Sequence, residues 1–171
     1  LDRLSVSVEG RTLVVRNNAS AWGGYPGRPA GPVELAVGTH DLTAAWLNGS
    51  GSLAIDKVRG LSFDLAVHGS GSASVASAAV DQLKVAASGV GTIAVAGKAL
   101  KLTASVRGTS TIDASGLDAR DAVVSVEGPS AVRLSASNSA KIDAFGNSTV
   151  EVAGSPACTV NTQGSATVSG C

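Results

Sequence analysis

Apolar and polar residues alternate along most of the chain, on both sides of a glycine that recurs at a regular interval. The clearest copies read NGSGSLAI at residues 48–55, HGSGSASV at 68–75 and SGVGTIAV at 88–95. The interval between successive leading glycines is 18 to 20 residues, and these glycines are Gly49, Gly69, Gly89, Gly108, Gly128, Gly146 and Gly164. A motif repeated at a period near 20 residues is typical of a solenoid, in which each repeat forms one turn.

Alignment on the repeat glycine gives five apolar columns. They lie six, four and two residues before the glycine and four and six residues after it, as in the copy that contains Leu83, Val85, Ala87, Ile93 and Val95. Alternation with a period of two predicts two strands per turn, each with one face toward the interior. Residues 97–101 and 116–121 leave room for a third short strand or a turn. The pattern predicts an all-β chain, a parallel β-helix of about seven turns.

Charged residues at the outward positions test the parallel arrangement independently. Equivalent residues of adjacent parallel turns lie about 4.8 Å apart, so that opposite charges are favoured there and like charges are not. The alignment places Asp64 beside Lys84, Lys101 beside Asp121, Arg107 beside Glu127, and Arg133 between Asp113 and Glu151. An antiparallel sandwich would not bring these residues together, so the charges favour a parallel β-helix.

The N-terminal part of the chain lacks the repeat. Residues 4–8 and 12–16 alternate around Glu9 and Gly10 and predict a β-hairpin. Residues 32–37 and 42–47 resume the strand pattern. We expect one domain over residues 1–171, in which residues 1–40 supply the hairpin, a loop and a cap, and residues 41–171 supply the repeating turns. The hairpin would cover one end of the solenoid, because open strand edges recruit other chains.

The two cysteines, Cys158 and Cys171, lie close together at the C-terminal end of the sequence. They have neither a CxxC redox spacing nor His or Cys companions for zinc. We therefore predict a disulfide formed in an oxidising compartment. It would fasten the last turn, stabilise the fold by about 3 kcal/mol in the chain-entropy model and, with Pro156 nearby, blunt the second end of the solenoid.

The overall charge and the histidines exclude several classes of function. Thirteen basic and thirteen acidic residues cancel, so there is no basic field for nucleic acid. No apolar run approaches the roughly 18 residues of a membrane span. His40 and His68 have no second ligand at metal-binding spacing, and we expect no metal and no cofactor. The chain contains no methionine, so the start codon is expected outside it, and removal of a signal peptide or trimming would each account for this.

The irregular stretch 17–32 holds the candidate binding residues Trp22, Tyr25 and Arg28. Aromatic rings beside an arginine can stack on sugars or anchor a partner protein. The alternative is that Trp22 and Tyr25 fold back, with Trp46, to plug the first turn of the solenoid. The sequence leaves both alternatives open.

The sequence fits two further activities of β-solenoids poorly. Enzymes of this fold that cleave acidic polysaccharides need clustered carboxylates, whereas each prominent outward charge here has an opposite neighbour. Ice-binding solenoids carry threonine arrays, and this chain stacks Thr92, Thr111, Thr149 and Thr167. Ala131 interrupts that array and a charged column lies beside it. The sequence therefore favours a protein that is neither an enzyme nor an ice binder.

The Gly-Ser-Gly-x-hydrophobic-x-hydrophobic turns, the opening VSVEGRTLVVR at residues 6–16 and the cysteine-bearing ending resemble a bacterial family called the putative auto-transporter adhesin, head GIN domain. The resemblance implies a right-handed parallel β-helix and an exported protein. Ser52, Ser72 and Thr92 stand where aspartate is frequent in the family, which weakens the case for a calcium-binding stripe.

Taken together, the residues and the resemblance lead to three ranked functional hypotheses. The first is a non-enzymatic, exported protein of the periplasm, outer surface or extracellular space, with an adhesive or scaffolding role toward a cell-surface glycan or protein. The second is a carbohydrate-binding module that uses residues 22–29. The third is a degenerate polysaccharide-degrading enzyme.

Overall fold

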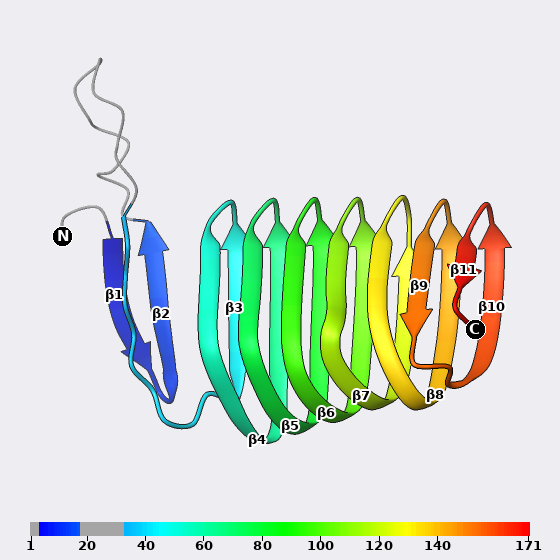
Figure 1. Ribbon diagram of the computed structural model, residues 1–171. Helices are drawn as coiled ribbons and strands as arrows, with labels where there is room; N and C mark the ends of the chain where they lie inside the picture. Colours follow the sequence, from blue (N-terminus) through cyan, green and yellow to red (C-terminus); the bar gives the residue numbers. More distant parts are fainter. Residues whose placement is uncertain (1–3, 18–32) are drawn as a thin grey trace, which may run out of the picture. The chain divides into compact units, whose positions relative to one another are not determined.

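A computed structural model describes residues 4–17 and 33–171 of the chain. The chain divides into two compact units, Leu1–Gly38 and Thr39–Cys171. In the first unit, β1 (Leu4–Glu9) and β2 (Thr12–Asn17) form an antiparallel hairpin (Figure 1). Gly10 turns the chain between them with a φ of 64°, a conformation that glycine adopts without steric cost. The predicted hairpin is confirmed, and its capping role stays a prediction.

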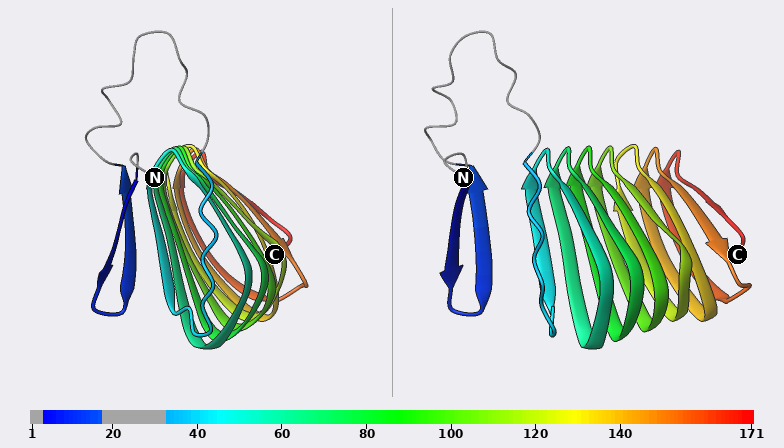
Figure 2. Two further views of the ribbon diagram at one scale, coloured as in Figure 1. Left: turned by 90° about the vertical axis from the view of Figure 1, so that its left-hand side faces the viewer. Right: turned by 60° about the vertical axis from the view of Figure 1, so that its left-hand side comes forward.

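The second unit is a parallel β-solenoid of about six turns, which confirms the predicted fold class (Figures 1 and 2). Seen end-on in the left panel of Figure 2, its successive turns form nested loops of similar outline. Hydrogen bonds join its strands in the order β11-β9-β8-β7-β6-β5-β4-β3, and β10 pairs with β8. The strands are β3 (Ala44–Gly49), β4 (Ser52–Gly69), β5 (Ser72–Gly89), β6 (Thr92–Gly108), β7 (Thr111–Glu127), β8 (Ala131–Gly146), β9 (Thr149–Ala153), β10 (Ala157–Gly164) and β11 (Thr167–Ser169).

Each turn in the middle of the solenoid is one long bent strand, where the sequence suggested two. Strand β5, for example, runs for 18 residues from one glycine corner to the next. The register places Gly69 beside Gly49 and beside Gly89 in the neighbouring turns, as the alignment predicted. Residues 33–37 were expected to form a strand, and they do not. Apolar and polar residues alternate in this segment, but no strand of the described residues pairs with it. Val33, Leu35 and Val37 are exposed.

The interior is a continuous stack of small and branched apolar side chains. The five predicted columns are buried through the middle turns, with Phe63, Leu83 and Leu102 stacked in one of them. The bend of each turn adds two further buried columns that the sequence analysis missed. The first contains Val58, Ala78 and Leu117, and the second contains Val80, Ala99, Ala119 and Ala136.

The bend is also where all variation in repeat length is located. Seven residues separate Val75 from Leu83 across the bend, whereas five separate Leu134 from Ala140. The strand register shifts only at this side of the turns, for example between Val75 and Ala78. The glycine corner and its flanking strands therefore keep a constant length, and the bend absorbs the difference between repeats of 20 and 18 residues.

Glycine is required at the corner by both its backbone conformation and its neighbours. Gly89 has a φ of 101°, and a Cβ atom there would lie 2.6 Å from the carbonyl oxygen of Gly69. Real Cβ contacts are longer than 3.0 Å. The corner thus lets consecutive backbones approach as closely as the sheet spacing demands.

Serine replaces glycine at the third corner position in the later turns. Gly71 and Gly91 occupy this position directly before β5 and β6, and the buried Ser110, Ser130 and Ser148 occupy it in the later turns. The hydroxyl of Ser110 donates to the carbonyl of Gly89 at 3.1 Å, and Ser130 donates to Gly108 at 2.6 Å. These two bonds tie the corners at Ser110 and Ser130 to the preceding ones, whereas the buried Ser148 hydroxyl has no partner among the described residues.

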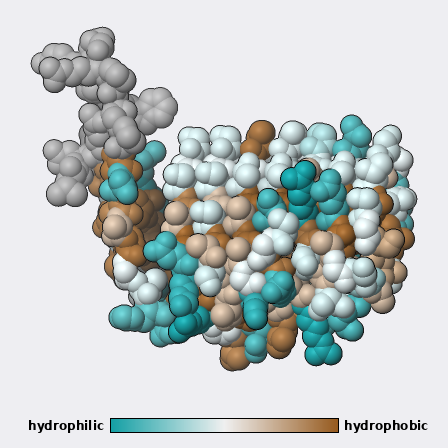
Figure 3. Space-filling view, viewed as in Figure 1, coloured by the Kyte–Doolittle hydropathy of each residue, from teal (hydrophilic) through white to brown (hydrophobic). Residues whose placement is uncertain are grey.

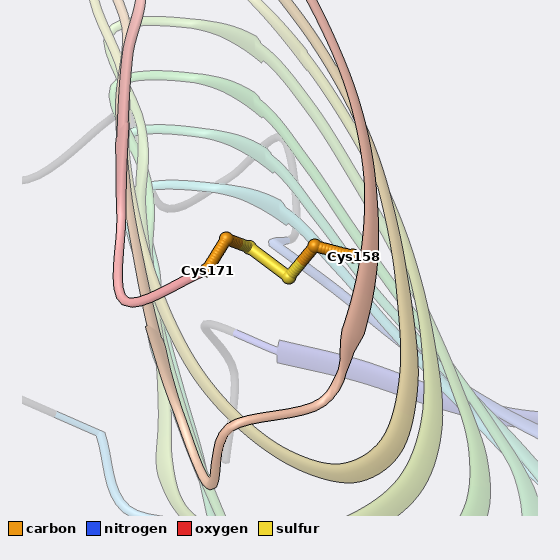
Figure 4. Close-up of a disulfide and its surroundings, with 2 residues drawn as sticks. All are labelled: Cys158 and Cys171. Atoms are coloured by element: carbon orange, nitrogen blue, oxygen red, sulfur yellow. A yellow bond between two sulfur atoms is a disulfide. The ribbon is translucent and has the colours of Figure 1, made fainter.

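The predicted disulfide between Cys158 and Cys171 is present, with a Cα–Cα distance of 5.7 Å. Figure 4 shows it reaching across the interior of the last turn, from strand β10 to the final residue. Cys158 packs against the hydrophobic core. The disulfide therefore holds the final segment against the last turn.

Replacing Gly89 with Ala should lower the free energy of unfolding by about 1–3 kcal/mol or more, because the alanine would have both a strained φ and a clash with the backbone of Gly69. Urea unfolding would measure the loss. The matched control is Gly51→Ala in an equivalent motif, where the nearest atom to the new Cβ is Leu47 Cδ1 at 3.4 Å and φ is not left-handed. Equal stability of the two variants would contradict this explanation of the corner.

Replacing both cysteines with serine should lower the free energy of unfolding by about 3 kcal/mol, because the unfolded chain regains the entropy of the open loop. Adding reductant to the wild-type protein should lower its stability by a similar amount and leave the double variant unchanged. A double variant that unfolds at the wild-type urea concentration would show that the disulfide does not stabilise the fold.

Candidate functional site

The binding residues predicted from the sequence, Trp22, Tyr25 and Arg28, lie outside the described residues. Trp46, which was considered for the same plug, is described and is 57% exposed on β3. It pairs in register with Ala66, while its neighbours Ala45 and Leu47 pack against the core. Strand alternation thus turns Trp46 to the outer face, and its proposed role in plugging the first turn is wrong.

The predicted charge columns are stacked as expected. Arg107 Nε lies 3.2 Å from Glu127 Oε2, and Arg133 Nε lies 2.8 Å from Glu151 Oε2. Asp113 faces Arg133 in register. Its carboxylate also accepts hydrogen bonds from the backbone N–H of Ser115 at 3.1 Å and from the Ser115 hydroxyl at 2.6 Å. These bonds, and then the charge of Arg133, lower the pKa of Asp113.

A second polar network surrounds Asp121 beside the bend. Asn138 Nδ2 and Ser139 Oγ each donate to its carboxylate at 2.6 Å, and Arg120 Nε lies 3.9 Å away. The two hydrogen bonds lower the pKa of Asp121, and the positive charges of Arg120 and Lys101 lower it further. The sequence alignment predicted that Lys101 lies beside Asp121 in the neighbouring turn, and the register confirms this. It missed Asn138 and Ser139, which the shortened bend of β8 brings to this carboxylate.

The remaining predicted pair and one histidine lie on the outer face before the corner. Asp64 faces Lys84 in register, but no ion pair joins them in the described part of the chain. His68 Nδ1 forms a 2.6 Å hydrogen bond with Ser88 Oγ on the next turn. Within residues 4–17 and 33–171, no group of three His, Cys, Asp or Glu side chains is arranged to hold a metal ion.

A shallow groove of about 600 Å³ runs over the bend. Its lining comes from the bends of β5, β6, β7 and β8, between which the bend shortens, and from Gly154. Four charged side chains line it, Asp81, Lys98, Asp118 and Arg120, together with the exposed Leu100. Equal numbers of both signs give the lining no net charge. The sequence analysis missed this groove, although the change from seven to five bend residues is the signal that could have revealed it.

The carboxylates of these two networks are poorly suited to act as general acids. A general acid needs a raised pKa to hold its proton near neutral pH, whereas the pKa values of Asp113 and Asp121 are both lowered.

On the face shown in Figure 3, hydrophilic side chains of the solenoid form small separate groups among neutral and apolar ones. The threonine column is also stacked, with Thr167 donating to Thr149 at 3.4 Å, and Ala131 interrupts it as predicted.

Replacing Ser115 with Ala should raise the pKa of Asp113 toward its ordinary value of 3.8, because the hydroxyl donor, the largest cause of the lowering, is lost while the backbone N–H donor remains. A carboxyl with a lowered folded-state pKa stabilises the fold above this ordinary, unfolded-state value and ceases to do so as the pH falls through the folded pKa. The variant should therefore lose less stability than the wild type on acidification below pH 4.

NMR titration of the Asp113 carboxyl would measure this change directly. Ser125→Ala, a similar change at an exposed outward position of β7, is the matched control and should leave Asp113 unaffected. An unchanged Asp113 pKa in Ser115→Ala would contradict the assignment of the hydrogen bonds as the main cause.

Comparison with known proteins identifies the family. The model of the family described as "Putative auto-transporter adhesin, head GIN domain" matches residues 1–156, which is most of the chain. No curated protein and no solved structure gives a significant match. Among the described residues no helix is long and apolar enough to cross a membrane. The chain therefore belongs to the family of the putative auto-transporter adhesin, head GIN domain.

Proposed function

We propose that the chain is a non-enzymatic, exported adhesin-like module that attaches to a glycan or protein of a cell surface. The observation that carries the proposal is the family match over residues 1–156, because the family is named for an adhesin head. The Cys158–Cys171 disulfide supports export, since disulfides persist in oxidising compartments such as the periplasm and the extracellular space.

The surface of the solenoid supports a binding role more than a catalytic one. Its most prominent charges are held by neighbours, as in the Arg133–Glu151 ion pair and the hydrogen-bonded carboxylate of Asp121. Groups held in this way present a fixed pattern of donors and acceptors, which suits recognition of a surface. The lowered pKa values of Asp113 and Asp121 argue against the third hypothesis, a polysaccharide-degrading enzyme that would use either of them as its acid.

Carbohydrate binding is the more specific form of this function. Trp22, Tyr25 and Arg28 supply the residue types that stack on sugar rings, and the neutral groove over the bend offers a second place for an extended polymer. Apolar side chains such as Leu100 combined with both signs of charge can contact the ring faces and hydroxyl groups of an uncharged glycan.

Tryptophan fluorescence of the oxidised protein, titrated with a panel of purified bacterial surface polysaccharides and with surface proteins, would test the proposal. We expect a saturable change with at least one of them. Trp22→Ala should weaken that binding at least tenfold if residues 22–29 form the site, as measured by isothermal titration calorimetry, which does not depend on the tryptophan that the variant lacks. Trp46→Ala, which removes an exposed tryptophan from the outer face of β3, is the matched control.

The outcomes separate the alternatives. Binding that survives Trp22→Ala and is lost in Lys98→Ala would move the site to the groove over the bend. The absence of binding to every polysaccharide and protein of the panel would contradict an adhesive role. Turnover of a polysaccharide during the titration would contradict the non-enzymatic assignment.

A further inference from the structure

The groove over the bend has a regular construction that narrows the class of glycan it can bind. Four successive strands, β5 to β8, supply most of its lining, and their bends lie side by side in Figure 1. The column at its centre is buried, so that its side chains point into the core, and it consists of Val80, Ala99, Ala119 and Ala136. Because successive strand residues point to opposite faces, the residues before and after this column point outward and form two rows along the groove.

Both rows cross the four turns from β5 to β8. The first row is aligned by the strand register and contains Ala79, Lys98, Asp118 and Ser135. The second row follows the central column by one residue in each turn and contains Asp81, Leu100, Arg120 and Ser137. Adjacent turns are about 4.8 Å apart, so the rows are long enough to contact several consecutive sugars. The groove therefore suits an extended chain more than a single sugar.

Each row carries one charge of each sign, and these charges are available to a ligand. Lys98 and Asp118 are direct neighbours in register, yet no ion pair joins them among the described residues. Asp81 likewise forms no ion pair within that part of the chain, and Arg120 approaches Asp121 only at 3.9 Å. The lining thus presents both carboxylate acceptors and cationic donors.

This mixture of charges favours an uncharged ligand over a charged polymer. A sugar hydroxyl can donate to a carboxylate and can also accept from an ammonium or guanidinium group, so an uncharged chain can satisfy both rows. A polyanion along the groove would pass both Asp81 and Asp118, and a polycation would pass both Lys98 and Arg120. Like charges placed together at a binding surface oppose association and exclude the wrong partner.

We propose that the groove binds an extended, uncharged glycan, and that Asp81 and Asp118 are the specificity-determining residues that reject acidic polysaccharides. The inference rests on the proposed function, which is glycan binding, and adds the place, the charge class of the glycan and the residues that select it. Lys98 and Arg120 reject cationic polymers in the same way. Leu100, which is 54% exposed, supplies an apolar contact for the face of a sugar ring.

Isothermal titration calorimetry with oligosaccharides of equal length would test this selectivity. The uncharged probes are cellohexaose, maltohexaose and N-acetylchitohexaose, the acidic probe is hexagalacturonate, and the cationic probe is chitohexaose. The wild type should bind at least one uncharged probe and bind each charged probe at least about tenfold more weakly. Lys98→Ala combined with Leu100→Ala should weaken the binding of the uncharged probe at least about tenfold, because a donor and an apolar contact are both lost.

Asp81→Lys combined with Asp118→Lys tests the two carboxylates directly. The charged side chains of the lining are then all positive, so hexagalacturonate should bind at least about tenfold more tightly than to the wild type, and less tightly as salt is added. The matched control is Asp41→Lys with Asp56→Lys, which changes the total charge equally at exposed positions outside the groove. The control should show no such gain.

The outcomes separate this inference from the proposed function. Circular dichroism would verify that each variant is folded. Hexagalacturonate bound by the wild type as tightly as the uncharged probes, uncharged binding unchanged in the Lys98/Leu100 variant, or no gain of the Asp81/Asp118 variant over the control would each overturn the inference and leave glycan binding standing. A wild type that binds none of the probes would contradict both.

Discussion

Close contact between the glycine backbones of consecutive turns is the constraint on which the solenoid depends. At each corner the chain adopts a left-handed conformation, and the carbonyl of one corner lies where a Cβ atom of the next would be, as Gly89 shows against Gly69. A larger residue would separate the turns at this point and lengthen the hydrogen bonds of the ladder on both sides. The corner therefore sets the register from which the stacked core and the charge columns both follow.

Much of the fold could be predicted because the spacing of the repeat glycines determines this register. Once the glycines are aligned, the inward columns, the pairing of Arg107 with Glu127 and the alternation around Arg133 follow from strand geometry alone. The disulfide could be predicted because only two cysteines exist and they lie near one another in sequence. The inward columns and the charge pairs depend on positions at a constant distance from the corner.

The bend could not be predicted in the same way, because its length changes from turn to turn. A change of one or two residues shifts the alternation: the buried column lies nine residues before the following glycine at Val80, Ala99 and Ala119, but ten residues before it at Ala136. The same irregularity hid the donors Asn138 and Ser139 of Asp121 and the groove over the bend. The hydrogen bond from Ser115 to Asp113 could have been predicted, because an aspartate side chain often accepts hydrogen bonds from the residue two positions later. The aromatic residues of the stretch 22–29 lie outside the described residues.

The division of each turn into a constant corner and a variable bend has a consequence for how such a protein can change. Residues inserted or deleted at the corner would disturb every ladder in contact with it, whereas the bend already differs by two residues between Val75–Leu83 and Leu134–Ala140 without loss of the core. New loops can therefore be added along one side of the molecule while the rest of the scaffold is kept. For an engineer, this side is the natural place to graft a recognition sequence. In evolution, it is where relatives that share the same corners can diverge in what they bind.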